Sequence, residues 1–116
     1  MISPDGGTVM FRRLPDILAQ RDVSLLAYKS ISQALADPQF CGTFENDVAM
    51  IVSRNGQLYS LNLQAALMWD ELRNPASLDD LVECVMSVFT DGVDGVRADL
   101  SRCLDGMERL GLLERI

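Results

Sequence analysis

Neighbouring carboxylates are the side chains of this sequence that are most suited to acid–base chemistry. They occur as Asp70-Glu71 and Asp79-Asp80, and Asp91 and Asp94 form a third, looser pair. A carboxylate-based hydrolase needs two such groups facing each other across a cleft, but neighbours on a helix point about 100° apart. The stretch from Asp91 to Gly95 also lacks the ligand periodicity of a calcium loop. We therefore expect no catalytic and no metal-binding residues.

The sequence contains no histidine, which excludes Ser-His-Asp and Cys-His catalysis and histidine-ligated zinc. Its three cysteines, Cys41, Cys84 and Cys103, are widely spaced and form no Cys-x-x-Cys pair. This pattern favours buried, reduced thiols over a disulfide framework. We expect a cytoplasmic protein that is not an enzyme and carries no cofactor.

Charge is unevenly distributed along the 116 residues, whose net charge is −7. Residues 1–37 contain four basic and four acidic side chains, whereas residues 38–116 contain six basic and thirteen acidic ones. The negative charge of the later part repels a phosphate backbone, so nucleic-acid binding is disfavoured. No apolar stretch is long enough to span a membrane, and the first residues lack the pattern of a secretory signal.

The elements that would position any site begin with an N-terminal arm, residues 1–37. Arg12–Ala36 is predicted to be mainly helical, because Pro15-Asp16 can open a helix and Asp37-Pro38 would end one. The apolar residues of this stretch also fit a strand, which stays open as an alternative.

A hairpin is predicted in the middle of the chain. Asn55-Gly56 separates two short runs, Val48–Val52 and Gln57–Leu61, and a type I′ turn needs positive φ at both central residues. Phe40–Phe44 is a candidate for another strand. Together these segments would form a small antiparallel meander.

Helical spacing of apolar residues replaces the strand pattern from Asn62 onward. Ser77 and Asp80 fit a capping box at the start of a second helix, and Gly111 fits the left-handed position after a third. A turn is expected at Asp91–Gly95. The expected helices are residues 62–72, 77–89 and 96–110. Residues 38–116 are therefore predicted to form an α+β, winged-helix-like domain, a small antiparallel β-meander followed by a three-helix bundle.

The strand Gln57–Leu61 is the first candidate for a binding site. At a sheet edge, its unpaired N–H and C=O groups can accept another strand. The last helix can form the second wall of a groove, with Leu100 and Leu104 offering apolar contacts. A DNA-binding transcriptional regulator of the winged-helix class is the alternative, although the outward side chains of the last helix are of mixed charge.

The stretch from Asn55 to Asn62, followed by Trp69, resembles the G-x-x-Y-x-L-N…W signature of the coenzyme PQQ synthesis protein D (PqqD-like) family. Ser77–Leu81 and Leu110–Leu113 resemble the second-helix and closing segments of that family. The resemblance covers residues 38–116. It implies a RiPP recognition element, which is a non-catalytic peptide chaperone with a winged-helix-like fold.

The resemblance also implies partners and site residues. Such a protein binds the leader segment of a ribosomal precursor peptide by strand addition and presents it to a modifying enzyme, often a radical SAM protein. Leu61 and Trp69 should be structural, and the arm is a candidate for completing the sheet, covering the groove or forming a homodimer. The implied peptide-binding residues are Gln57, Leu58, Tyr59, Ser60 and Leu61 on the strand, and Arg97, Leu100, Ser101 and Leu104 on the helix.

Overall fold

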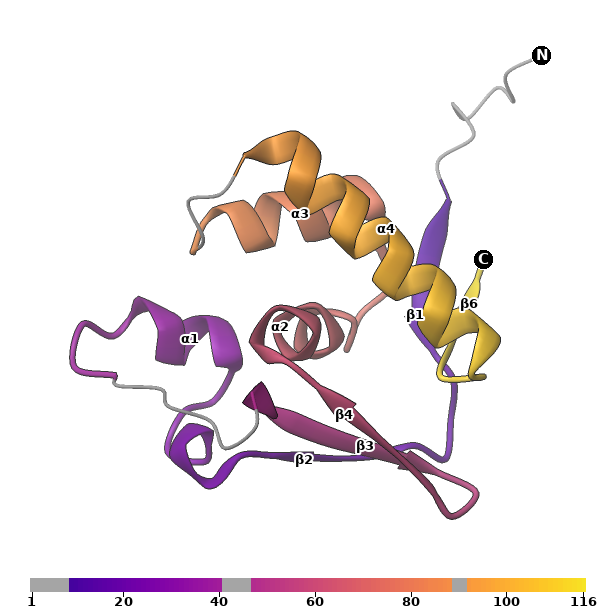
Figure 1. Ribbon diagram of the computed structural model, residues 1–116, viewed down its shortest axis with the longest axis horizontal. Coiled ribbons are helices and arrows are strands. Elements are labelled where there is room, and N and C mark those ends of the chain that lie inside the picture. The colour runs from indigo at the N-terminus through magenta and orange to yellow at the C-terminus, as the bar shows by residue number, and fades with distance from the viewer. Residues whose placement is uncertain (1–8, 41–46, 89–91) are drawn as a thin grey trace.

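The computed structural model describes residues 9–40, 47–88 and 92–116. In Figure 1, helix α2 lies between the three-stranded sheet β2–β3–β4 on one side and the helices α3 and α4 on the other. The strands are β1 (Met10–Arg13), β2 (Leu18–Arg21), β3 (Met50–Arg54), β4 (Gln57–Leu61), β5 (Ala76–Ser77) and β6 (Leu113–Arg115). The helices are the 3-10 turn η1 (Val23–Leu25), α1 (Ile31–Ala36), α2 (Leu63–Glu71), α3 (Leu78–Met86) and α4 (Val93–Arg109). The class is α+β, as predicted.

The predicted hairpin is confirmed. Strands β3 and β4 pair antiparallel, and Arg54 lies opposite Gln57 across the turn. Asn55 and Gly56 have φ values of 53° and 81°, as a type I′ turn requires. The meander therefore ends in β4, which is an edge strand in the order β2–β3–β4.

The third strand of this sheet is Leu18–Arg21, and the prediction of a mainly helical Arg12–Ala36 is wrong. Asp16 adopts a φ of 64° after Pro15, so the chain turns there instead of opening a helix. Leu18–Arg21 then pairs antiparallel with β3, and this long-range pairing overrides the local pattern. The helix at the end of the stretch does form, as α1. Phe40 is outside any strand, and the rest of the predicted strand Phe40–Phe44 lies outside the described residues.

A second sheet, with the order β5–β1–β6, was not predicted. Phe11 of β1 lies opposite Ala76 on one side and opposite Arg115 on the other. The amide of Leu14 also donates to the carbonyl of Leu112, at 3.1 Å. Strand β1 thus joins the chain before the hairpin to the segment before α3 and to the segment after α4 (Figure 1).

Local signals position the three later helices. The side chain of Asn62 caps α2, and Ser77 and Asp80 form the predicted capping box of α3. Helix α4 begins at Val93, so the predicted turn at Asp91–Gly95 is wrong from residue 93 onward, and Asp91 lies outside the described residues. The amide of Val96 already donates to the carbonyl of Gly92, at 3.1 Å, so residues 93–95 belong to the first helical turn.

A buried carboxylate, Asp70, ties the segment before β3 to α2. It is 4% exposed and accepts hydrogen bonds from the amide of Ile31 at 2.9 Å and from the guanidinium groups of Arg21 at 3.1 Å and Arg73 at 3.3 Å. Arg21 also donates to the carbonyls that precede α1, each at 3.0 Å. A buried charge is tolerated only with such partners.

Replacing this carboxylate is expected to cost stability. Asp70→Ala leaves the amide of Ile31 and the guanidinium of Arg21 without their buried acceptor, and we expect a loss of about 3 kcal/mol in the free energy of unfolding. Urea denaturation followed by circular dichroism measures it. Asp99→Ala is the control, because Asp99 pairs with Arg102 on the surface and should change stability by about 0.5 kcal/mol or less. Equal stability of the two variants would contradict the role given to Asp70.

Candidate functional site

The outer edge of β4 opens onto a groove. Among the described residues, β4 pairs on one side only, with β3. Its other side borders a groove of about 450 Å³ whose second wall is the C-terminal half of α4. The lining residues are Leu58, Tyr59, Ser60, Leu61, Asn62, Ala65, Cys103, Gly106, Met107, Leu110 and Leu112.

Register decides which backbone groups of β4 face this groove. The amide of Ala49 donates to the carbonyl of Leu61 at 2.8 Å, so the polar groups of Leu61 point toward β3. Backbone groups alternate along an antiparallel strand, so Tyr59 also bonds β3 while Leu58 and Ser60 direct their N–H and C=O groups away from it. The free edge therefore presents the donors and acceptors of Leu58 and Ser60.

The groove is uncharged. None of its described lining residues is acidic or basic, although the chain carries a net charge of −7. Burial raises the pKa of the Cys103 thiol, so this group is also neutral at physiological pH. Leu58 and Leu110 remain 70% and 45% exposed, so apolar surface lies next to the open strand edge.

The structure divides the residues predicted for the helix wall from those predicted for the strand. Gln57, Leu58, Tyr59, Ser60 and Leu61 all belong to β4, and the last four line the groove. Leu100 and Leu104 are each 1% exposed and pack into the core, so they offer no free apolar surface.

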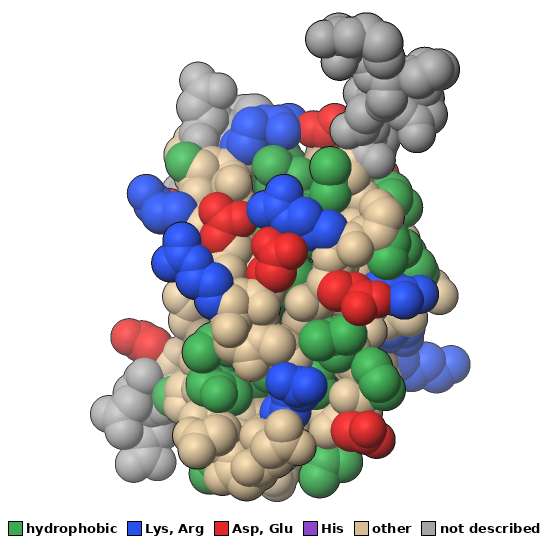
Figure 2. All heavy atoms as spheres, turned by 90° about the vertical axis from the view of Figure 1, so that its right-hand side faces the viewer, with side chains coloured by type: hydrophobic (Ala, Val, Ile, Leu, Met, Phe, Trp, Pro, Cys, Tyr) green, Lys and Arg blue, Asp and Glu red, His purple; other side chains and the backbone are tan. Residues whose placement is uncertain are grey.

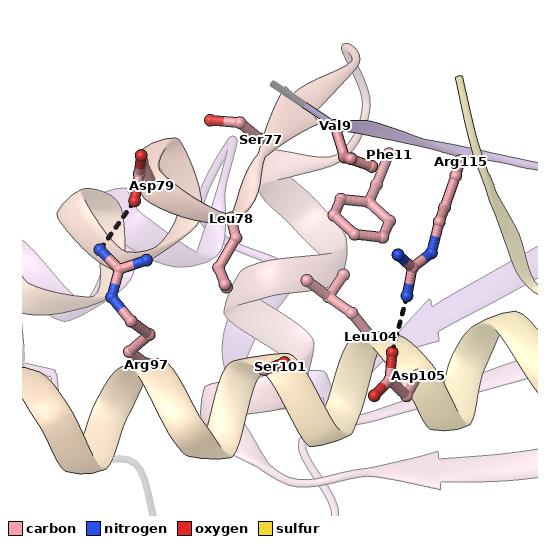
Figure 3. Close-up of a pocket in the computed structure, with 10 residues that line it drawn as sticks. All are labelled: Val9, Phe11, Ser77, Leu78, Asp79, Arg97, Ser101, Leu104, Asp105 and Arg115. Carbon is pink, nitrogen blue, oxygen red and sulfur yellow. Dashed lines mark hydrogen bonds and ion pairs between the residues drawn. The ribbon is translucent and has the colours of Figure 1, made fainter. Parts of the chain in front are cut away.

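Arg97, Ser101 and Leu104 instead line a second cleft, of about 360 Å³, on the other flank of α4 (Figure 3). At 100° per residue, Arg97 and Ser101 fall on one side of the buried stripe that contains Leu104, and the groove-lining positions 103, 106 and 110 fall on the other side. The predicted wall and the strand edge therefore do not face the same space.

The charged groups of the second cleft are paired with one another. Arg97 contacts Asp79 at 2.7 Å, and Arg115 contacts Asp105 at 2.9 Å, as drawn in Figure 3. Figure 2 shows that basic and acidic side chains are interspersed over the face at the right-hand side of Figure 1. The described side chains of this face form no extended field of positive charge toward a phosphate backbone.

The sequence analysis missed the residues of α4 that do line the groove: Cys103, Gly106, Met107 and Leu110. Their spacing of three, one and three residues places them on one side of a helix, and that signal was available in the sequence. The signal was missed because Leu100 and Leu104, which belong to the apolar stripe of the same helix, were assigned both to the core and to the wall of the groove.

In the part of the chain that the structure describes, no group of three or more His, Cys, Asp or Glu side chains is arranged to hold a metal ion. No described helix combines the length and the apolar character needed to cross a bilayer.

Comparison with known families relates this site to a class of proteins. The profile of the family described as coenzyme PQQ synthesis protein D matches residues 44–113, which is more than half of the chain. The chain belongs to the PqqD family. Proteins of the PqqD family are non-catalytic accessory proteins that bind a precursor peptide. Searches of the curated proteins and of the solved structures gave no match.

The structure explains why the PqqD-like signature has its spacing. Gly56 supplies the positive φ of the hairpin, Leu61 is 7% exposed in the core, and Asn62 caps α2. Trp69 is 1% exposed, and the guanidinium of Arg13 lies 4.7 Å from the centroid of its ring. The structural roles expected for Leu61 and Trp69 are confirmed. These motif residues build the strand edge, whereas the α4 wall of the groove lies outside the motif.

Proposed function

We propose that this protein binds an extended segment of a ribosomally made precursor peptide as an additional strand along β4, and that it presents this peptide to a modifying enzyme. The observation that carries the proposal is the open edge of β4 beside an uncharged groove. The protein itself is a non-catalytic chaperone, and the modifying enzyme is of the radical SAM class.

The edge and the groove supply different parts of recognition. The outward N–H and C=O groups of Leu58 and Ser60 offer backbone hydrogen bonds that any extended peptide can make. Side chains of the added strand alternate in direction, so every second one points into the space between β4 and α4. Affinity then comes from the strand, and selectivity comes from the lining of the groove.

The uncharged lining fits an apolar segment of the peptide. A charged side chain entering the groove would lose hydration and find no described partner of opposite charge among the lining residues. The acidic side chains that the structure describes lie elsewhere, several of them in ion pairs such as Arg97–Asp79. Basic flanks of a bound peptide would be favoured by the overall charge but would lie outside the groove.

Calorimetric titration with any short precursor peptide that is found encoded next to this gene tests the proposal. We expect one-to-one binding at micromolar affinity or tighter, retained by the isolated leader segment and lost by the remaining core segment. A leader segment that does not bind the folded protein, either alone or with the modifying enzyme present, would contradict the proposal.

A further inference from the structure

Gly106 stands in the helical wall of the groove, in the interior of α4. Glycine is unfavourable at such a position, because it loses more backbone freedom than other residues when it enters a helix. Such a glycine is tolerated at a cost in stability relative to alanine, and the reasons that can offset this cost lie in packing, in backbone conformation or in function.

The protein's own packing and backbone supply no such reason. Apart from its chain neighbours and the backbone of its own helical turns, a Cβ atom built on Gly106 would meet no heavy atom of the described chain within 4 Å, and the backbone there is helical. Gly111, at the end of the same helix, shows the contrast. It has a φ of 75°, and a Cβ there would collide with the guanidinium of Arg54. The fold thus requires glycine at residue 111 but not at residue 106.

The open space beside Gly106 belongs to the groove. Cys103, Met107 and Leu110 surround this position on α4, and the opposite wall is the free edge of β4. The missing side chain leaves a depression in an otherwise apolar wall, at the place where every second side chain of an added strand would point.

We propose that Gly106 is a specificity-determining residue whose missing side chain makes room for a bulky apolar residue of the bound peptide, such as Leu, Met or Phe. This inference rests on the proposed function, because it needs a peptide strand beside β4. It adds that the peptide is selected at one position by size and by lack of charge.

The same helix offers a matched control in Gly95. It also lies in α4, and a Cβ there would meet nothing within 4 Å, but it is exposed and does not line the groove. Alanine at either position removes the entropic disadvantage of glycine, so neither variant should melt at a lower temperature than the parent protein. A difference in peptide affinity between the two variants then comes from the added side chain in the groove and not from a change in stability.

The test uses a display library of random short peptides selected on the full chain, with the tightest binder made as a fluorescent probe. We expect the selected peptides to share one bulky apolar position. Gly106→Ala should weaken binding of the probe by about tenfold, and Gly106→Leu should weaken it further, because each added side chain occupies the space of the ligand. Gly95→Ala and Gly95→Leu should change the affinity by about twofold or less.

The outcomes separate this inference from the proposed function. Peptides that lose affinity with proline in β4 but bind Gly106→Leu as tightly as Gly95→Leu would overturn the role of Gly106 and leave strand addition standing. Selection of charged or small residues at every position would overturn it as well. Peptides that bind equally well to the proline variant would overturn strand addition, and the inference would fail with it.

Discussion

A Leu58→Pro chain is expected to fold and to lose peptide binding. The amide of Leu58 points away from β3, so proline removes no hydrogen bond within the sheet, and an edge strand tolerates it at such a position. Proline does remove the outward donor that an added strand would use, and its ring stands in the path of that strand. We expect affinity for the peptide to fall by at least about tenfold, measured by calorimetry.

Two control variants distinguish the loss of the outward backbone donor from a loss of folding and from the loss of the Leu58 side chain. Tyr59→Pro removes an amide that bonds β3, so it should destabilise the hairpin by about 3 kcal/mol and lower the melting temperature. Leu58→Ala removes most of the Leu58 side chain, which is 70% exposed, but it keeps the outward backbone donor. Because the donor is retained, this variant should keep much of the affinity for the peptide. If the Leu58→Pro chain is folded and binds the peptide as tightly as the parent protein, β4 is not the docking strand.

A chain that begins at residue 38 is expected not to fold. It lacks β1, which is the central strand of the second sheet, and β2, which completes the meander. It also lacks the amide of Ile31 and the guanidinium of Arg21 that satisfy the buried Asp70, and Arg13, which donates to the carbonyl of Trp69 at 3.0 Å. These losses together exceed the stability of a domain of this size.

Thermal unfolding followed by circular dichroism measures this effect. The chain beginning at residue 38 should show no cooperative transition, whereas a chain beginning at residue 9 keeps every contact named above and should melt like the parent protein. The division into an arm, residues 1–37, and a domain, residues 38–116, stays a prediction that this experiment decides. Cooperative unfolding of the shorter chain would establish that division and contradict our expectation.

Local signals were sufficient to predict much of the later part of the fold. Asn55-Gly56 predicted its hairpin because only a few residues adopt positive φ at both turn positions, and Ser77 with Asp80 predicted the start of α3. β1 and β2 could not be predicted in this way. Each has four residues, and its conformation depends on partners distant in the sequence, such as Leu113–Arg115 for β1 and Met50–Ser53 for β2.

The position of the candidate strand could be predicted from the sequence, whereas the position of the helix wall could not. The edge position of Gln57–Leu61 follows from the order of strands along the chain, and the sequence analysis placed the candidate docking strand there. The helix wall depends on how far α4 is rotated about its own axis, which is set by packing against α3 and β6. A rotation that buries Leu100 and Leu104 brings Gly106 and Leu110 to the groove.

The alternation of backbone groups along β4 gives its free edge a period of two residues. Binding of a peptide to this edge therefore depends on its register along β4 as well as on its sequence. Moving its bulky residue by one position would turn that side chain away from α4, while moving it by two would return it to the same wall in a neighbouring place. Where a second point of the peptide is also held, insertion of one residue between the two points should impair binding more than insertion of two.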